Sequence, residues 1–416
     1  MRLRTVVVAL IVVAALVGAA AVGLAGSDGG LAQQWVSDTA RENEVNHHAV
    51  GVGPRAEVVV APVAAVPNAE PIGPHSCSLV RLDPSDGASL WNWSVPADDC
   101  FTHALTQPVV ADVDADGGLE VAVSTTQNAM VVLDAETGTE QWRVPLDTYG
   151  YGQPAVGDVT GGPGLELATS DIGGTVVLAH GNGTTAWQAE TDMPIWARPW
   201  LTDVDGDGSR DVLVGGGDGV VVFAGDGTTL WNASLPATEV VVAESETGTT
   251  VLTGDVRTLT AIDGTTGEQR WNRTVSGTPR IHATGDADGD GQTEVYAGVG
   301  ENTVTSVDVA SGTVEWETPL GGGERQSMFA PVLGDVDGDD TQEVVAVTND
   351  GTVAVLDGAT GEELAAYERD VRIWTFASTA DVDDDGDDEI LVRYGDGRVV
   401  MLDWRTGGEP ALQTVG

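Results

Sequence analysis

One composite unit recurs along most of this chain, and it limits the folds that the chain can adopt. Each copy holds an acidic loop, two valine-rich runs, a turn and a tryptophan; the clearest copy runs from Asp112 to Trp142. A glycine marks the turn about every 45 residues, at Gly87, Gly138, Gly183, Gly227, Gly267, Gly312, Gly361 and Gly407. A period near 45 residues, with several short strands in each unit, is typical of the blades of a β-propeller.

The turn glycines predict an all-β, eight-bladed β-propeller that spans residues 51–416. In the clearest copy, valine-rich runs bounded by Gly, Asp and Asn predict strands A to D at 107–113, 120–125, 130–135 and 140–146. The first unit and the unit around 239–264 lack the acidic loop. Seven blades plus a separate hairpin is therefore the alternative count.

The amino terminus predicts export. Arg2 and Arg4 precede an uncharged stretch that ends at Ser27, which is long enough to span a bilayer, since a transmembrane helix needs about 20 residues. We expect residues 1–27 to form a transmembrane anchor with the propeller on the extracellular side; a cleaved signal segment and a secreted protein are the alternative. Residues 28–50 are polar and are expected to form a linker.

The charge of the chain is extreme. Its formal net charge is -47, all 18 basic residues are arginine, and there is no lysine. Dense carboxylates keep a protein hydrated where salt screens their repulsion, so this composition indicates a halophilic, haloarchaeal source. A surface of this kind argues against nucleic acid as a partner, because phosphate binding needs basic clusters.

The acidic loops carry the strongest chemical signal. Five copies follow the pattern D-x-D-x-D-G-x-x-E/D, with carboxylates at positions 1, 3, 5 and 9; one copy has Asp340 in place of the glycine. Oxygen ligands at alternate positions of a tight loop suit calcium, and we expect about five structural calcium sites. Acidic turns without a metal, in a halophile, are the alternative. The expected ligands are Asp112, Asp114, Asp116, Glu120; Asp203, Asp205, Asp207, Asp211; Asp286, Asp288, Asp290, Glu294; Asp335, Asp337, Asp339, Glu343; and Asp381, Asp383, Asp385, Glu389.

These loops resemble the FG-GAP calcium loops of integrin-type propellers, since the closing acid stands at position 9 and a β run follows directly. A further copy keeps only Asp158 and Glu166 and is expected to be empty. The segments 131–142, 259–271 and 304–316 resemble the pyrroloquinoline-quinone-like propeller repeat. That resemblance implies that one tryptophan per unit docks each blade on the next. The tryptophans are Trp91, Trp142, Trp187, Trp231, Trp271 and Trp316, with Ala365 and Ala411 in the last two units.

Other residues suggest covalent modification. Cys77 and Cys100 flank a predicted hairpin of the first unit, which predicts a disulfide in an exported protein; two free thiols are the alternative. Four N-x-S/T sequences predict glycosylation at Asn92, Asn182, Asn232 and Asn272.

The connectors from strand D to the next strand A form the candidate ligand face, because they surround one mouth of a propeller's channel. They contain Trp196, Arg198, Arg280, Arg325, Arg372 and Trp374, with further aromatic residues beside them. Arginine and tryptophan are the residues that most often anchor interfaces. Pairing of each arginine with a nearby acid, together with aromatic packing between blades, is the alternative reading.

The sequence favours a non-catalytic role. It has no nucleophile elbow, zinc-protease motif or phosphate-binding loop, and His103, His180 and His282 lie in different units. Quinone-dependent dehydrogenases of this fold carry an adjacent cysteine pair, which is absent here, so no quinone is expected. We therefore expect a membrane-tethered binding or scaffold module whose partner is a cell-surface protein or glycan. A quinoprotein-like oxidoreductase and a carbohydrate-binding or lyase propeller are the alternatives.

Overall fold

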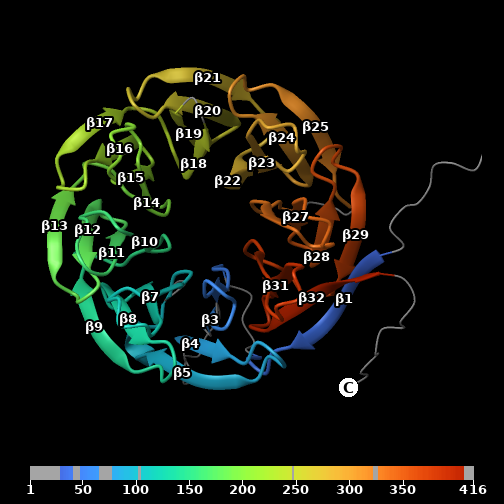
Figure 1. The fold of residues 1–416 in the computed structure, drawn as a ribbon, viewed down its shortest axis with the longest axis horizontal. Helices are drawn as coiled ribbons and strands as arrows, with labels where there is room; N and C mark the ends of the chain where they lie inside the picture. The colour runs from blue at the N-terminus through green and yellow to red at the C-terminus, as the bar shows by residue number, and fades with distance from the viewer. Residues whose placement is uncertain are drawn as a thin grey trace, which may run out of the picture.

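The protein is a ring of eight four-stranded antiparallel sheets arranged around a central axis (Figure 1). The computed structural model describes residues 29–40, 47–64, 77–101, 105–245, 248–321 and 327–406. The prediction of an eight-bladed propeller is confirmed, and the seven-bladed alternative is wrong. Within the described residues, no helix is long and apolar enough to cross a membrane. The predicted anchor, residues 1–27, lies outside them.

Each blade runs from strand A at the channel to strand D at the outer edge. The first four blades are β2–β5 (Gly51–Val52, Val59–Val63, Cys77–Leu82, Ser89–Val95), β6–β9 (Val109–Ala111, Glu120–Thr125, Ala129–Asp134, Glu140–Pro145), β10–β13 (Ala155–Gly157, Glu166–Ser170, Thr175–His180, Thr185–Glu190) and β14–β17 (Trp200–Thr202, Asp211–Gly216, Gly219–Phe223, Thr229–Ala233). The next three are β18–β21 (Glu239–Ser245, Gly248–Asp255, Thr258–Asp263, Gln269–Thr274), β22–β25 (Pro279–Gly285, Glu294–Val299, Thr303–Asp308, Val314–Pro319) and β26–β29 (Val332–Gly334, Glu343–Val347, Thr352–Leu356, Glu363–Glu368). The eighth consists of β30–β32 (Ser378–Ala380, Glu389–Arg393, Val399–Thr406) and β1 (Gly29–Val36).

The valine-rich runs form the middle strands because these strands are covered on both faces. In the second blade every residue of β7 is buried, whereas the outer strand β9 alternates between exposed side chains and side chains that are half-buried or buried. The apolar clusters lie between neighbouring blades: Val60 and Leu79 of the first blade pack with Val121 and Val131 of the second. Each blade is therefore stabilised by the next, and the ring needs closure.

Tryptophans on the outer strands dock each of the first six blades on the following one, as the repeat family implies, whereas the seventh blade has Ala365 at this position. A Cβ built on Gly138 would lie 2.7 Å from the ring of Trp91, so only glycine fits at the turn that receives the ring. The indole Nε1 of Trp91 also donates to the Ala135 carbonyl, at 2.9 Å. The same glycine contact is made by Trp142, Trp187, Trp231, Trp271 and Trp316 on Gly183, Gly227, Gly267, Gly312 and Gly361.

The amino-terminal strand closes the ring. We expected residues 28–50 to be a linker, but β1 pairs antiparallel with β32, from Gly29 opposite Thr406 to Val36 opposite Val400. Its Trp35 takes the docking position: the ring covers Gly87, and Nε1 donates to the Pro84 carbonyl at 2.8 Å. The eighth outer strand therefore comes from the start of the chain, and Ala411, which we aligned with the docking tryptophans, lies outside the described residues.

The structure contains the predicted disulfide between Cys77 at the start of β4 and Cys100, which follows the 3-10 helix η1 (Ala97–Asp99). Both cysteines are buried. The four predicted glycosylation residues, Asn92, Asn182, Asn232 and Asn272, are all exposed, so a glycan could be attached without unfolding the blade.

We expect the double substitution of Cys77→Ser and Cys100→Ser to lower the free energy of unfolding by about 3 kcal/mol, because the disulfide restricts the unfolded chain. Denaturant unfolding measures this loss. A reducing agent should produce the same change in the wild type and no change in the double variant. Mass mapping that finds both thiols free in the exported protein would contradict the prediction.

Candidate functional site

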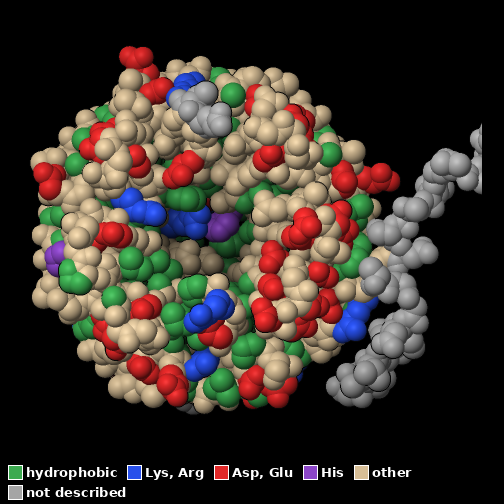
Figure 2. Space-filling view, in the orientation of Figure 1, with side chains coloured by type: hydrophobic (Ala, Val, Ile, Leu, Met, Phe, Trp, Pro, Cys, Tyr) green, Lys and Arg blue, Asp and Glu red, His purple; other side chains and the backbone are tan. Residues whose placement is uncertain are grey.

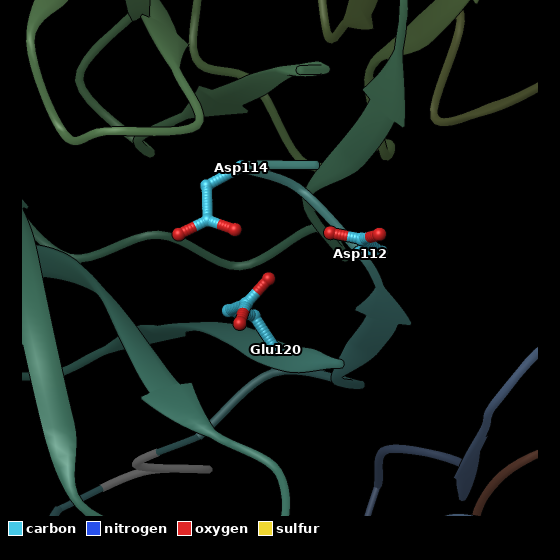
Figure 3. A group of neighbouring side chains, drawn as sticks. All are labelled: Asp112, Asp114 and Glu120. Carbon is cyan, nitrogen blue, oxygen red and sulfur yellow. The ribbon is translucent and has the colours of Figure 1, made fainter. Parts of the chain in front are cut away.

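Two features stand out: the acidic loops and a cavity at the channel mouth. The acidic loops join strand A to strand B in five blades, and Figure 3 shows Asp112, Asp114 and Glu120 of the first one pointing toward one another. Strand polarity places these loops on the face that also carries the turns between strands C and D. The connectors from D to A lie on the opposite face.

All five loops have the same internal hydrogen bonds. The carboxylate at position 1 accepts from the backbone N–H of position 6, at 2.8–3.2 Å. The carboxylate at position 5 accepts from the N–H of position 7, at 2.7–3.1 Å. Position 6 has a φ between 67° and 104° in every copy, which explains its glycine; Asp340 adopts the same left-handed conformation. The five loops thus share one backbone geometry as well as one sequence pattern.

Three carboxylates converge in most of these loops. Oxygen atoms lie within 4.8 Å of one another in groups formed by Asp112, Asp114 and Glu120; by Asp203, Asp205 and Asp211; by Asp286, Asp288 and Asp290; and by Asp335, Asp337 and Asp339. Four of the loops bury a carboxylate oxygen that has no hydrogen-bond partner in the described part of the chain. These orphaned oxygens belong to Asp112, Glu294, Asp337 and Glu389.

The surroundings of the closing acids disfavour their charged form. Burial, together with nearby carboxylates, raises the pKa of Glu294 to about 8. The same causes raise the pKa of Glu343 and of Glu389 to about 7, and that of Asp211 to about 6. A divalent cation would relieve this repulsion and would satisfy the orphaned oxygens. A set made only of oxygen donors suits calcium, so the residues present fit the ion that the sequence implies.

The degenerate loop provides an internal comparison. Burial alone would raise the pKa of Glu166, but hydrogen bonds from Val159, Thr160 and His180 lower it. Both of its carboxylate oxygens are satisfied: Thr160 Oγ1 and His180 Nδ1 reach Oε1 at 2.7 and 2.9 Å, and Val159 N reaches Oε2 at 2.8 Å. Protein groups here make the contacts that a cation would make in the other loops.

One acidic residue was missed in the sequence. Glu315 of the outer strand β25 joins Asp288 and Glu294 within 4.8 Å, and its own pKa is raised by burial and by nearby acids. Glu315 directly precedes the docking residue Trp316, and this position in the repeat is the sequence feature that could have identified it. The corresponding residue of the second blade, Gln141, also reaches the closing acid, since its Nε2 lies 3.4 Å from Glu120 Oε1.

The connectors from strand D to strand A enclose a cavity of about 490 Å³ at the opposite mouth. Four of the six residues predicted for the ligand face line it: Trp196, Arg198, Arg280 and Trp374. The side chain of Arg372 lies 5.6 Å from the ring of Trp374 but does not line the cavity. Arg325 lies outside the described residues.

Aromatic rings form much of the cavity wall. Tyr151 and Trp196 meet edge to face, with ring centroids 5.5 Å apart, and Trp196 remains 40% exposed. His48 packs against Tyr151, and His47 packs against Trp374. Both histidines belong to the segment that we expected to be a linker; sequence reasoning missed them, and the adjacent His pair was the only signal.

The two arginines of the cavity differ in their partners. Arg280 forms an ion pair with Glu239, as the alternative reading of the connectors expected. Arg198 has no ion pair among the described residues, and its guanidinium carbon lies 4.0 Å from the centre of the Trp200 ring. The structure thus brings one uncompensated cation together with exposed aromatic surface, which is an arrangement that binds ligands.

Known structures share this architecture. BamB from Moraxella catarrhalis superposes with a TM-score of 0.61 at 16% identity, covering 91% of this chain and 99% of that one. Quinohemoprotein alcohol dehydrogenase from Comamonas testosteroni gives 0.65 at 14% identity, covering 94% and 78%. Sqt1 from Saccharomyces cerevisiae gives 0.65 at 10% identity, covering 89% and 100%. Identities this low show the fold alone.

A comparison with curated protein sequences gives no significant match. The family model described as outer membrane protein assembly factor BamB, built on the pyrroloquinoline-quinone-like repeat, matches residues 75–160, 172–341 and 292–415. These segments cover most of the propeller and include the five acidic loops and the six residues predicted for the ligand face, but not His47 and His48. On this match, the chain belongs to the BamB-like family of repeat propellers.

Proposed function

We propose that this chain is an exported, membrane-tethered β-propeller that acts as a non-catalytic binding scaffold at the cell surface and is stabilised by about five structural calcium ions. The observation that carries the scaffold role is the cavity at the D-to-A mouth, with its exposed Trp196 and its uncompensated Arg198. The family description names an assembly factor, which supports a protein partner. A cell-surface glycan is the other class of partner.

The calcium proposal rests on the shared geometry of the five loops and on their orphaned oxygens. An ion in each loop would tie strand A to strand B and so fix the inner strands that surround the channel. The metal would thus act on stability, and partner binding would remain at the opposite mouth.

An oxidoreductase is the second candidate, favoured by the fold similarity to quinohemoprotein alcohol dehydrogenase. The cysteines argue against it, because Cys77 and Cys100 are 23 residues apart and bonded to each other. Absorbance of a bound quinone, or dye reduction that depends on added quinone, would support this candidate over the scaffold.

The scaffold proposal predicts that the double substitution of Trp196→Ala and Trp374→Ala weakens partner binding by about tenfold or more, because tryptophans that line a binding cavity often anchor interfaces. Surface crosslinking followed by affinity measurement on the identified partner checks this. The matched control is Leu90→Ala with Leu230→Ala, which removes two exposed apolar side chains from the outer strands β5 and β17. If the control loses binding while the mouth variant retains it, the partner docks on the outer edge instead.

A further inference from the structure

Arg198 lies at the floor of the mouth cavity, where that cavity meets the central channel. The mouth cavity, of about 490 Å³, and a second cavity of about 370 Å³ inside the channel share five lining residues. These are Gln107, Gln153, Arg198, His282 and Phe376. Figure 2 shows basic and histidine side chains at the bottom of the central hollow, whereas acidic side chains are scattered over the surrounding face.

The guanidinium of Arg198 is held in place and remains free to donate. One face of it packs on the Trp200 ring, and that ring is fixed by a hydrogen bond from its Nε1 to the Val240 carbonyl at 3.0 Å. In the described part of the chain, no hydrogen bond uses the side-chain N–H groups of Arg198. Stacking leaves the edge of a guanidinium available, and that edge carries five N–H donors.

Among the described residues, the floor carries a single positive charge. Burial lowers the pKa of Arg198 to about 10, so it stays cationic at neutral pH. Burial and the nearby Arg198 lower the pKa of His282 well below its ordinary value, so that this imidazole is neutral. Arg280 and Glu239 cancel each other. A half-buried charge without a counter-ion costs stability, and one carboxylate placed against it would remove that cost.

The shape of the cavity and the residues of its wall limit which kind of ligand can supply that carboxylate. The cation lines the same cavity as Tyr151, Trp196 and Trp374, so a ligand that enters through this mouth meets aromatic rings beside it. A narrow chain end fits this path better than a folded surface does. The terminal carboxylate of a protein offers two oxygens to a guanidinium, and the side chain of the last residue would lie among the rings.

We propose that the mouth cavity captures the free C-terminal carboxylate of a partner protein, with Arg198 as its counter-ion and the aromatic wall holding the last side chain. This inference rests on the proposed scaffold function and names how the partner is recognised. Two amide side chains at the floor are also held in place. Gln107 Nε2 donates to the Val50 carbonyl at 3.3 Å, and Gln153 Nε2 donates to the Pro108 carbonyl at 3.0 Å.

The test compares two immobilised hexapeptide libraries with randomised last positions, identical except that one ends in a free carboxylate and the other in a carboxamide. The full chain should be retained by the free-acid library, with apolar or aromatic last residues enriched, and should be released from the amide library. Arg198→Gln should weaken retention by about tenfold or more, whereas Arg198→Lys should keep part of it because the charge remains. Equal retention on both libraries would overturn the proposal.

Melting temperatures of both variants show whether they fold. If Arg198→Gln is unfolded, Arg198→Lys and the acid-to-amide comparison on the wild type still decide the outcome. Binding of the full chain to an immobilised oligomer of hexuronic acid, with no retention on either peptide library, would assign the site to acidic sugars and reject the peptide. If neither library binds but a partner still docks on the mouth, the scaffold function stands and this inference fails.

Discussion

Removing calcium from this protein should lower its melting temperature by about 10 °C or more. A ligand present at 100 times its dissociation constant stabilises the folded state by about 2.7 kcal/mol per site, and the structure offers five loops of one geometry. Chelation leaves clustered carboxylates without a counter-ion, as the raised pKa values of Glu294, Glu343 and Glu389 indicate. Scanning calorimetry at constant salt, with chelator and then with calcium restored, measures the shift.

Single substitutions make this prediction sharper. Asp205→Ala removes one carboxylate of a converging group and should lose one bound calcium ion per chain in elemental analysis. The matched control is Glu166→Gln in the degenerate loop, which should leave the calcium content unchanged because protein groups already satisfy that carboxylate. A purified protein that holds no calcium, and that melts at the same temperature with and without chelator, would disprove the proposed sites.

The repeats made the middle of the fold predictable, because their information is local. In the second blade the expected strands 120–125, 130–135 and 140–146 differ from β7, β8 and β9 by at most one residue at either end. The acidic loops were equally accessible, since the hydrogen bonds that all five loops share join residues no more than five positions apart. A pattern that is complete within one unit can be recognised without knowing how the units meet.

The features that were missed depend on contacts between distant parts of the chain. Gly29–Val36 is an outer strand with mostly half-buried and exposed side chains, so it has no apolar alternation that would distinguish it from a linker. The pairing of Arg280 with Glu239, 41 residues earlier, depends on how the inner strands β22 and β18 of neighbouring blades pack together. Sequence reasoning could place Arg198 and Arg280 on the same face, but only the structure separates the compensated cation from the uncompensated one.

Deleting residues 1–36 should open the ring and destabilise the protein more than any single substitution. The deletion removes β1 and Trp35, leaves β32 with an unpaired edge, and uncovers Gly87 in the first blade. Loss of a buried tryptophan alone costs about 3–5 kcal/mol, so the truncated chain should melt at a much lower temperature or fail to unfold cooperatively.

The matched control for this truncation is a deletion of residues 1–28, which stops just before β1 and should leave the melting temperature of the propeller unchanged. Trp35→Ala in the full chain should account for part of the loss, because its ring covers Gly87 and its Nε1 bonds to the Pro84 carbonyl. A synthetic peptide of residues 29–40 should restore stability to the truncated protein, since Ser37 and Thr39 also bond to Val399 and Gly397. If both truncations melt at the temperature of the full chain, then β1 does not close the ring in solution and β32 is a stable edge.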